Sequence, residues 1–329
     1  MKKYIILSFS ILMAACDTLV QEISPSKIPN TDPKLVVGCF ISPQDKFVNV
    51  RVLTTTPFFG TQELQTNSGV GISLASGKDT VYIPAKEDII DAIVEISEGG
   101  KTTPLKYTPF EGTYRAAMLV LAGKTYTLKV TAKDGRNVTA TCTVPKPIAI
   151  ESYKTDSVAT TLTDNVKGTN VIITGFNKLV NVTWKDIAGE SNFYEMSGFT
   201  ELATTTITSG VKKSGTTYSL IYFNNQGGRG AFFDDKNMDG KPITATKGLY
   251  VNLENQRTNG NPNFIAPTVR SASLSLSHVD ENYYRYRRSI YDSRNQNFFT
   301  EPTLTYTNIK GGYGCFGAYN TTLKEIYRR

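Results

Sequence analysis

The sequence has 329 residues, of which 40% are hydrophobic and 20% are charged, and its net charge is +7. This balance is typical of a globular chain that can bury a real core, and the length allows two modest domains or one large one. The positive surplus is mild, so composition gives no case for a nucleic-acid-binding protein.

The first twenty residues, MKKYIILSFSILMAACDTLV, have the order of a signal peptide. Two lysines follow the initiating methionine, residues 4–13 are largely apolar, and two alanines precede Cys16. The apolar run is shorter than the roughly 20 residues that cross a bilayer. A box of small or aliphatic residues that ends in cysteine is typical of bacterial lipoprotein signals. We therefore predict a signal peptide over 1–15 and lipidation of Cys16, with acyl chains that anchor the protein in a membrane.

Residues 16–33 contain three prolines and no periodicity, which predicts a tether between the lipid and the first domain. From Lys34 onward, apolar and polar residues alternate in several short runs. The clearest run is YTLKVTAKDGRNVTATCTV, where Asp134-Gly135 is typical of a hairpin turn. The spacing of these runs predicts an immunoglobulin-like β-sandwich over 34–146.

The prolines of Pro145-Lys146-Pro147 mark a boundary, because proline ends a strand ladder. Further alternating runs predict a second β-rich domain over 147–329. One helix is expected near 278–292, with Ser277 as its N-cap. Its apolar stripe is expected to lie against the sheet of the second domain and consists of Val279, Tyr283, Tyr286 and Ile290. The predicted fold is thus mainly β, with a sandwich followed by a second β-rich domain that carries one short helix.

Cysteine and histidine are scarce, so the sequence offers no zinc site and no cofactor is predicted. Cys39 and Cys142 lie on apolar faces near the first and last strands of the first domain. In an oxidising envelope they form either a disulfide or two buried thiols, and the sequence leaves both alternatives open.

The stretch FFDDKNMDGKPI raises the question of calcium. Asp235, Asn237 and Asp239 match the first half of a calcium loop, but the twelfth position is Thr246 instead of the expected bidentate acid. A polar turn between strands is therefore favoured, and the three residues are only a weak metal candidate.

The sequence contains no recognisable set of catalytic residues, and we therefore predict that the protein is not an enzyme. His278 is the single histidine, Cys315 has no histidine at a recognisable spacing, and no nucleophile elbow is present. Gly312-x-Gly314-x-x-Gly317 matches the dinucleotide fingerprint in letters but lacks its βαβ context, so close backbone contacts explain it better. The tyrosines and arginines of 283–288 are read as a core stripe and a solvated face. A pair of carboxylates of the glycosidase kind stays open.

Several segments in order resemble the envelope lipoproteins of the domain-of-unknown-function family 4249, found in the Bacteroidetes. These are DPKLVVGCFISP, YTLKVTAKDGRNVTATCTVPKP, WKDIAGESNFYEM, FFDDKNMDGK, NYYRYRRSI and EPTLTYTNIKGGYGCFGAY. Asn308-Ile309, Gly311-Gly312 and 314–317 fit the closing pattern of the family, whereas the turn at 187–190 lacks the usual prolines. The resemblance implies an outer-membrane lipoprotein encoded near TonB-dependent receptors, and it implies no catalytic residues.

We therefore expect a lipid-anchored outer-membrane protein on the periplasmic or cell-surface face. Its expected role is that of a ligand-binding or accessory subunit of a TonB-dependent uptake system, with the receptor as partner. The alternative is a structural or adhesive surface lipoprotein without a small-molecule ligand.

Overall fold

A computed structural model describes most of the chain after residue 31. The described residues are 32–55, 71–73, 80–82, 88–166, 169–208, 210–223, 231–258, 264–294 and 304–329. The predicted signal peptide, Cys16 and nearly all of the tether lie outside the described residues. Within the described ranges, no helix is long and apolar enough to cross a membrane.

The first β-sandwich is built mainly from strands that precede residue 144. Its strands are β1 (Leu35–Ile41), β2 (Phe47–Thr54), β5 (Ile93–Glu98), β6 (Lys101–Thr108), β7 (Thr113–Ala117), β8 (Thr125–Thr131) and β9 (Asn137–Thr143). The predicted alternation holds, because Tyr126, Leu128 and Val130 of β8 are buried and the residues between them are exposed. β8 and β9 pair as a hairpin around Asp134-Gly135, where Gly135 has a φ of 90°. Two short strands, β3 (Gly71–Ser73) and β4 (Thr80–Tyr82), pair with each other.

Most strands of the second β-sandwich are longer than those of the first, and they enclose one buried core. Its strands are β10 (Ser152–Val166), β11 (Thr169–Lys185), β12 (Phe193–Thr208), β13 (Val211–Leu220), β14 (Tyr222–Phe223), β15 (Ala231–Asp234), β16 (Pro242–Thr258) and β17 (Phe264–Val279). A four-stranded sheet in the order β10-β11-β16-β14 packs on β12, β17 and their neighbours. Trp184 of β11, Met196 of β12 and Leu274 of β17 are fully buried between the two sheets.

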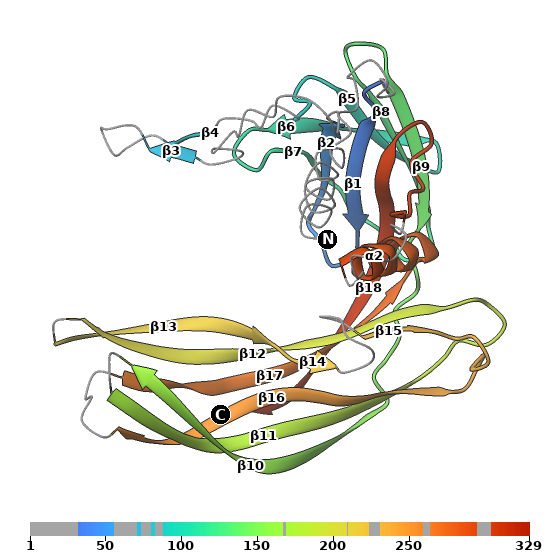
Figure 1. Ribbon diagram of the computed structural model, residues 1–329. Coiled ribbons are helices and arrows are strands. Elements are labelled where there is room, and N and C mark those ends of the chain that lie inside the picture. Colours follow the sequence, from blue (N-terminus) through green and yellow to red (C-terminus); the bar gives the residue numbers. More distant parts are fainter. Residues whose placement is uncertain are drawn as a thin grey trace, which may run out of the picture.

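One strand belongs to both sandwiches. β18 (Tyr313–Arg328) pairs in parallel with β1 through Ala318, and from Tyr319 onward it pairs antiparallel with β17. A twelve-stranded sheet in the order β13-β12-β17-β18-β1-β2-β7-β6-β5-β8-β9, with β15 beside β12, therefore runs through both bodies (Figure 1). Ile309, Phe316 and Ala318 are part of the first core, so this core draws on residues far beyond 146.

The mainly β fold, with one helix among the described residues, is confirmed, but the expected cap and the expected stripe of this helix are wrong. α2 (Glu281–Arg294) begins after Asp280, whose Oδ1 accepts the Tyr283 N–H at 2.9 Å and caps the helix. Ser277 is not the cap, because it is still paired with Thr321 in the sheet. Val279 of the expected stripe ends β17 and is not on the helix. The tyrosines do not lie on the second sheet alone, since Tyr283 packs edge-on against Phe40 of β1 at 5.0 Å. The helix therefore sits at the junction of the two sandwiches (Figure 1).

Candidate functional site

The junction is organised around Asp280, the residue between β17 and α2. Its backbone N–H donates to the Ala318 carbonyl at 2.9 Å, and its Oδ1 accepts the Ala318 N–H at 3.0 Å as well as the helix-capping bond. Burial raises the pKa of this carboxyl to about 6, even though the accepted N–H bonds favour the charged form. Asp280 thus joins the start of the helix to the strand that both sandwiches share.

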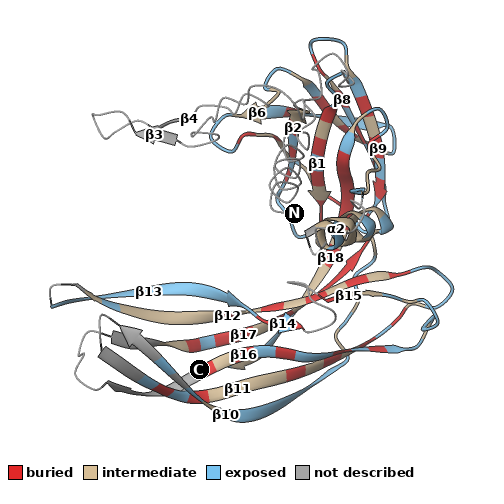
Figure 2. Ribbon diagram, viewed as in Figure 1, coloured by how far each residue is buried: buried red, intermediate tan, exposed pale blue. Residues whose placement is uncertain are grey.

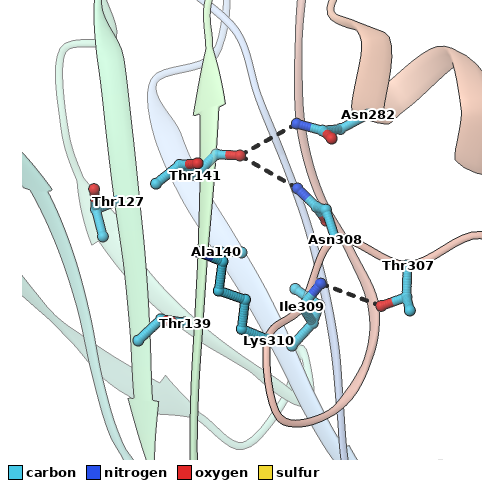
Figure 3. Close-up of a pocket in the computed structure, with 9 residues that line it drawn as sticks. All are labelled: Thr127, Thr139, Ala140, Thr141, Asn282, Thr307, Asn308, Ile309 and Lys310. Atoms are coloured by element: carbon cyan, nitrogen blue, oxygen red, sulfur yellow. Dashed lines mark hydrogen bonds between the residues drawn. The ribbon is translucent and has the colours of Figure 1, made fainter.

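One cavity, here called the threonine cavity, lies beside the first turn of α2. It has a volume of about 410 Å³, and threonines of β8 and β9 face the segment 307–310 across it. Figure 3 shows Asn282 and Asn308 converging on the Thr141 carbonyl, to which both side-chain amides donate at 3.2 Å. Asn308 also donates to the Phe316 carbonyl at 2.8 Å. The asparagines are therefore held in place, and the threonines of β8 and β9 line the cavity with them.

A second cavity, the junction cavity, has a volume of about 400 Å³ and takes its walls from both sandwiches. It is lined by 143–146 after β9, by 190–193 before β12, by 278–281, and by Gly123. His278 is 5% exposed, and its Nδ1 lies 2.8 Å from the Lys146 carbonyl oxygen. Burial lowers the pKa of His278, which favours the neutral imidazole. Lys146, Glu190 and Glu281 add charges of both signs around the opening.

Both cavities border β9 and the start of α2. Residues 139–141 of β9 and Asn282 line the threonine cavity, whereas Thr143 and Glu281 line the junction cavity. Hydroxyls, side-chain amides and charged groups line this stretch together with apolar surface. Ligand sites often combine apolar surface with a few polar groups in this way, and they often lie where two domains meet.

A group of carboxylates lies near His278, which lines the junction cavity. The carboxylate oxygens of Asp186, Asp235 and Asp239 lie within 4.8 Å of one another. Asp186 is buried and accepts the Tyr194 hydroxyl at 2.6 Å and the Gly240 N–H at 2.8 Å.

The other two carboxylates fasten the same pair of loops. Asp235 accepts the Asn192 N–H at 2.9 Å, and Asp239 accepts the Gly189 N–H at 2.7 Å. These bonds join the loop 186–192 to the turn 235–240, and they account for the arrangement without any further group.

The structure brings together two of the three weak metal candidates. Asp235 and Asp239 meet in this group, and Asn237 lies in the turn between them with a φ of 68°. Asp186 was not among the residues predicted from the sequence, because β12 to β15 separate it from the turn 235–240 along the chain. The pairing of β11 with β16 brings Asp186 close to Asp235 and Asp239. Among the described residues, these three carboxylates are the group that offers a cation several oxygen ligands, and a metal role stays the weak alternative to a polar turn.

The comparisons with known proteins identify the family. The profile of the family described as Domain of unknown function (DUF4249) matches residues 20–325. The chain belongs to this family. No curated protein matches the sequence. A solved structure titled "Structural basis for the promiscuous specificity of the carbohydrate-binding modules from the beta-sandwich super family" covers 68% of this chain and 96% of its own, at 13% identity and a TM-score of 0.18. A likeness this weak carries no argument.

The cysteines described in this DUF4249 chain are buried free thiols. Cys39, Cys142 and Cys315 are each exposed by 3% or less, and no bridge joins Cys39 to Cys142. Burial raises the pKa of all three thiols, so the nucleophilic thiolate is disfavoured. Of the two alternatives for Cys39 and Cys142, the structure therefore contains the buried thiols.

The closing glycines of this DUF4249 chain serve close backbone packing, as the sequence indicated. A Cβ on Gly314 would lie 2.0 Å from the Val37 carbonyl oxygen, and a Cβ on Gly312 would lie 2.4 Å from that of Leu35. A Cβ on Gly317 would press on the backbone of Tyr283 at 3.1 Å. The glycines let β18 approach β1 on one side and α2 on the other.

Proposed function

We propose that this protein is an outer-membrane lipoprotein that binds a small polar ligand at the junction of its sandwiches and assists a TonB-dependent receptor in its uptake. The observation that carries the binding role is the junction cavity, whose walls come from both bodies. Its hydroxyl, imidazole, ammonium and carboxylate groups offer a polar ligand hydrogen-bonding and charged partners, and its apolar surface offers contact area.

Binding is favoured over catalysis by the surroundings of the chemically reactive side chains. The imidazole of His278 is buried against the Lys146 carbonyl, and the three thiols are enclosed in packed regions. Neither arrangement offers an activated nucleophile, because activation needs a base within reach of the attacking group.

The anchor and the receptor rest on the sequence. The positive start, the apolar run and the small residues before Cys16 support lipidation, and the resemblance to envelope lipoproteins supports an outer-membrane site beside a receptor. A second candidate, a structural or adhesive surface protein, is favoured by one feature. β18 runs without interruption through both sandwiches and would stiffen a spacer.

The deciding experiment is a pull-down of the tagged, full-length protein from its native membranes in mild detergent, followed by mass spectrometry. We expect an acylated protein that brings a TonB-dependent receptor with it in near-stoichiometric amount. A Cys16→Ser variant is the control, and it should lose both the acyl mass and the membrane fraction. Recovery of the acylated protein without any receptor would reject the uptake role and favour the structural candidate.

The ligand site is tested separately. Small molecules released from the purified protein by denaturation are identified by mass spectrometry. Ser191 lines the junction cavity and is exposed, so Ser191→Tyr should fill the cavity and remove the co-purified ligand. Ser157→Tyr changes an exposed serine of β10 in the same way, away from the cavity, and should keep the ligand. Equal ligand content in both variants would reject this site.

A further inference from the structure

The twelve-stranded sheet ends in an edge strand that is exposed along its whole length. β13 pairs with β12 from Val211↔Thr208 to Leu220↔Phe199 without a register shift. All ten residues of β13 are exposed, which Figure 2 shows as a continuous pale strand. No other strand of the described residues pairs with its outer side.

An edge of this kind invites another strand, because it presents unpaired N–H and C=O groups. Proteins usually protect such edges with prolines, bulges or charges along the strand. β13 has no proline and no bulge, and its charges, Lys212 and Lys213, both lie at one end. The stretch from Ser214 to Leu220 is uncharged and ends in the exposed side chains of Tyr218 and Leu220.

The pairing with β12 determines which groups of β13 point outward. Just beyond β13, the Ile221 N–H donates to the Gly198 carbonyl at 2.8 Å. Because hydrogen-bonded and non-hydrogen-bonded pairs alternate along antiparallel strands, odd-numbered residues of β13 bond to β12. The even-numbered residues, from Lys212 to Leu220, therefore direct their backbone groups to the free side.

We propose that β13 pairs antiparallel with β13 of a second copy of this chain, about a two-fold axis at Gly215. In this register Ser214 opposes Thr216, Lys213 opposes Thr217 and Lys212 opposes Tyr218 of the second copy. Residues that oppose each other share a face of the sheet, so the ammonium group of Lys212 meets the ring of Tyr218. The two-fold axis makes each contact twice.

The charge distribution of the strand favours this register. No lysine opposes a lysine, and each lysine pair faces the uncharged end of the other strand. A slip by one residue would place even-numbered residues opposite odd-numbered ones, whose backbone groups already bond to β12, so the outward-directed groups would lose their partners. Registers that place Lys212 or Lys213 opposite a lysine of the second copy are disfavoured by charge repulsion, and the proposed register avoids this repulsion. The inference does not depend on the proposed ligand or receptor.

Cysteine cross-linking tests the register. The probe is the mature chain with Cys16→Ser, so that it is soluble. Gly215 would face its own counterpart in a non-hydrogen-bonded pair with Cα atoms about 4.5 Å apart, a distance that a disulfide spans. Gly215→Cys should therefore give a covalent dimer under mild oxidation. Thr217→Cys, which opposes Lys213, should not. Equal cross-linking of both variants, or none in either, would overturn the proposal.

Sedimentation velocity tests the dimer itself. We expect the protein with an unchanged β13 to form a concentration-dependent dimer. The dissociation constant of this dimer should rise about tenfold or more in Tyr218→Lys, because the new lysine lies opposite Lys212 of the second copy at two symmetry-related places. Tyr218→Phe keeps the ring and should keep the affinity within about twofold. Unchanged emission of the buried Trp184 checks that each variant is folded. A strictly monomeric protein, or a dimer indifferent to Tyr218→Lys, would refute pairing through β13.

Discussion

Replacing Asp280 with asparagine should alter how stability depends on pH. The carboxyl is buried at the junction, where its Oδ1 accepts two backbone N–H bonds, from Tyr283 at 2.9 Å and from Ala318 at 3.0 Å. Asparagine has the same shape and keeps an acceptor oxygen, but it carries no charge at any pH. The substitution therefore isolates the cost of ionising a carboxyl in this position.

The magnitude follows from the pKa of Asp280. Burial raises it from the ordinary value of 3.8 to about 6, so the folded protein binds this proton more tightly than the unfolded chain does. The resulting stabilisation is fully present below about pH 4 and is lost as pH rises through 6. Two pKa units correspond to about 3 kcal/mol. Relative to Asp280→Asn, the wild type should therefore lose about 3 kcal/mol in free energy of unfolding between about pH 4 and pH 7.

Urea unfolding, monitored by the fluorescence of Trp184, measures this difference in free energy of unfolding across the pH range. His278, two residues away, is present in both proteins, so its own titration largely cancels. Asp280→Ala serves as a contrast, because it removes the acceptor and should cost about 2–4 kcal/mol even at low pH. A wild-type-minus-asparagine difference that is flat with pH, or that favours the wild type as pH rises, would show that burial does not control this carboxyl.

Three further predictions test other parts of the structure. Tyr194→Phe removes the hydroxyl bond to buried Asp186 and should cost about 1.5–3 kcal/mol in urea unfolding, whereas Tyr284→Phe, at a more exposed bond, should cost less than about 0.5 kcal/mol. Gly314→Ala should cost about 3 kcal/mol or more because its φ is 106° and its Cβ meets the Val37 backbone, while Gly38→Ala has open space and should change thermal stability little. The thiols of Cys39, Cys142 and Cys315 should resist a thiol reagent in the native protein and react only after unfolding; rapid native labelling would contradict their burial.

The strands that have one buried and one solvated face could be predicted from the sequence. β8 and β9 alternate cleanly because their inner residues fill the first core and their outer residues face water. β18 could not be predicted in this way. Residues 314–318 are all buried, since α2 covers one face of the strand and the first core covers the other. Burial on both faces removes the period of two that reveals a strand.

The candidate site, too, was only partly predictable from the sequence. Asp235 and Asp239 are neighbours in one turn, so their local spacing was informative. Asp186 joins them only through sheet pairing, which no local pattern reports. The helix cap shows the same limit. Both Ser277 and Asp280 are suitable N-cap residues, and the pairing of Ser277 with Thr321 decides in favour of Asp280.

The junction joins both ends of the described chain, and this bears on how a ligand site there is held. Asn320 is 2% exposed, accepts a bond from Gln44 at 2.8 Å and donates to the Pro145 carbonyl at 2.9 Å. It therefore ties the loop after β1, the connection between the sandwiches and the middle of β18 to one point. Burying a polar side chain in this way costs free energy unless all of its hydrogen-bond partners are present. The relative placement of the sandwiches, and with it the junction cavity, consequently depends on contacts that form only after the last strand has been added to the first.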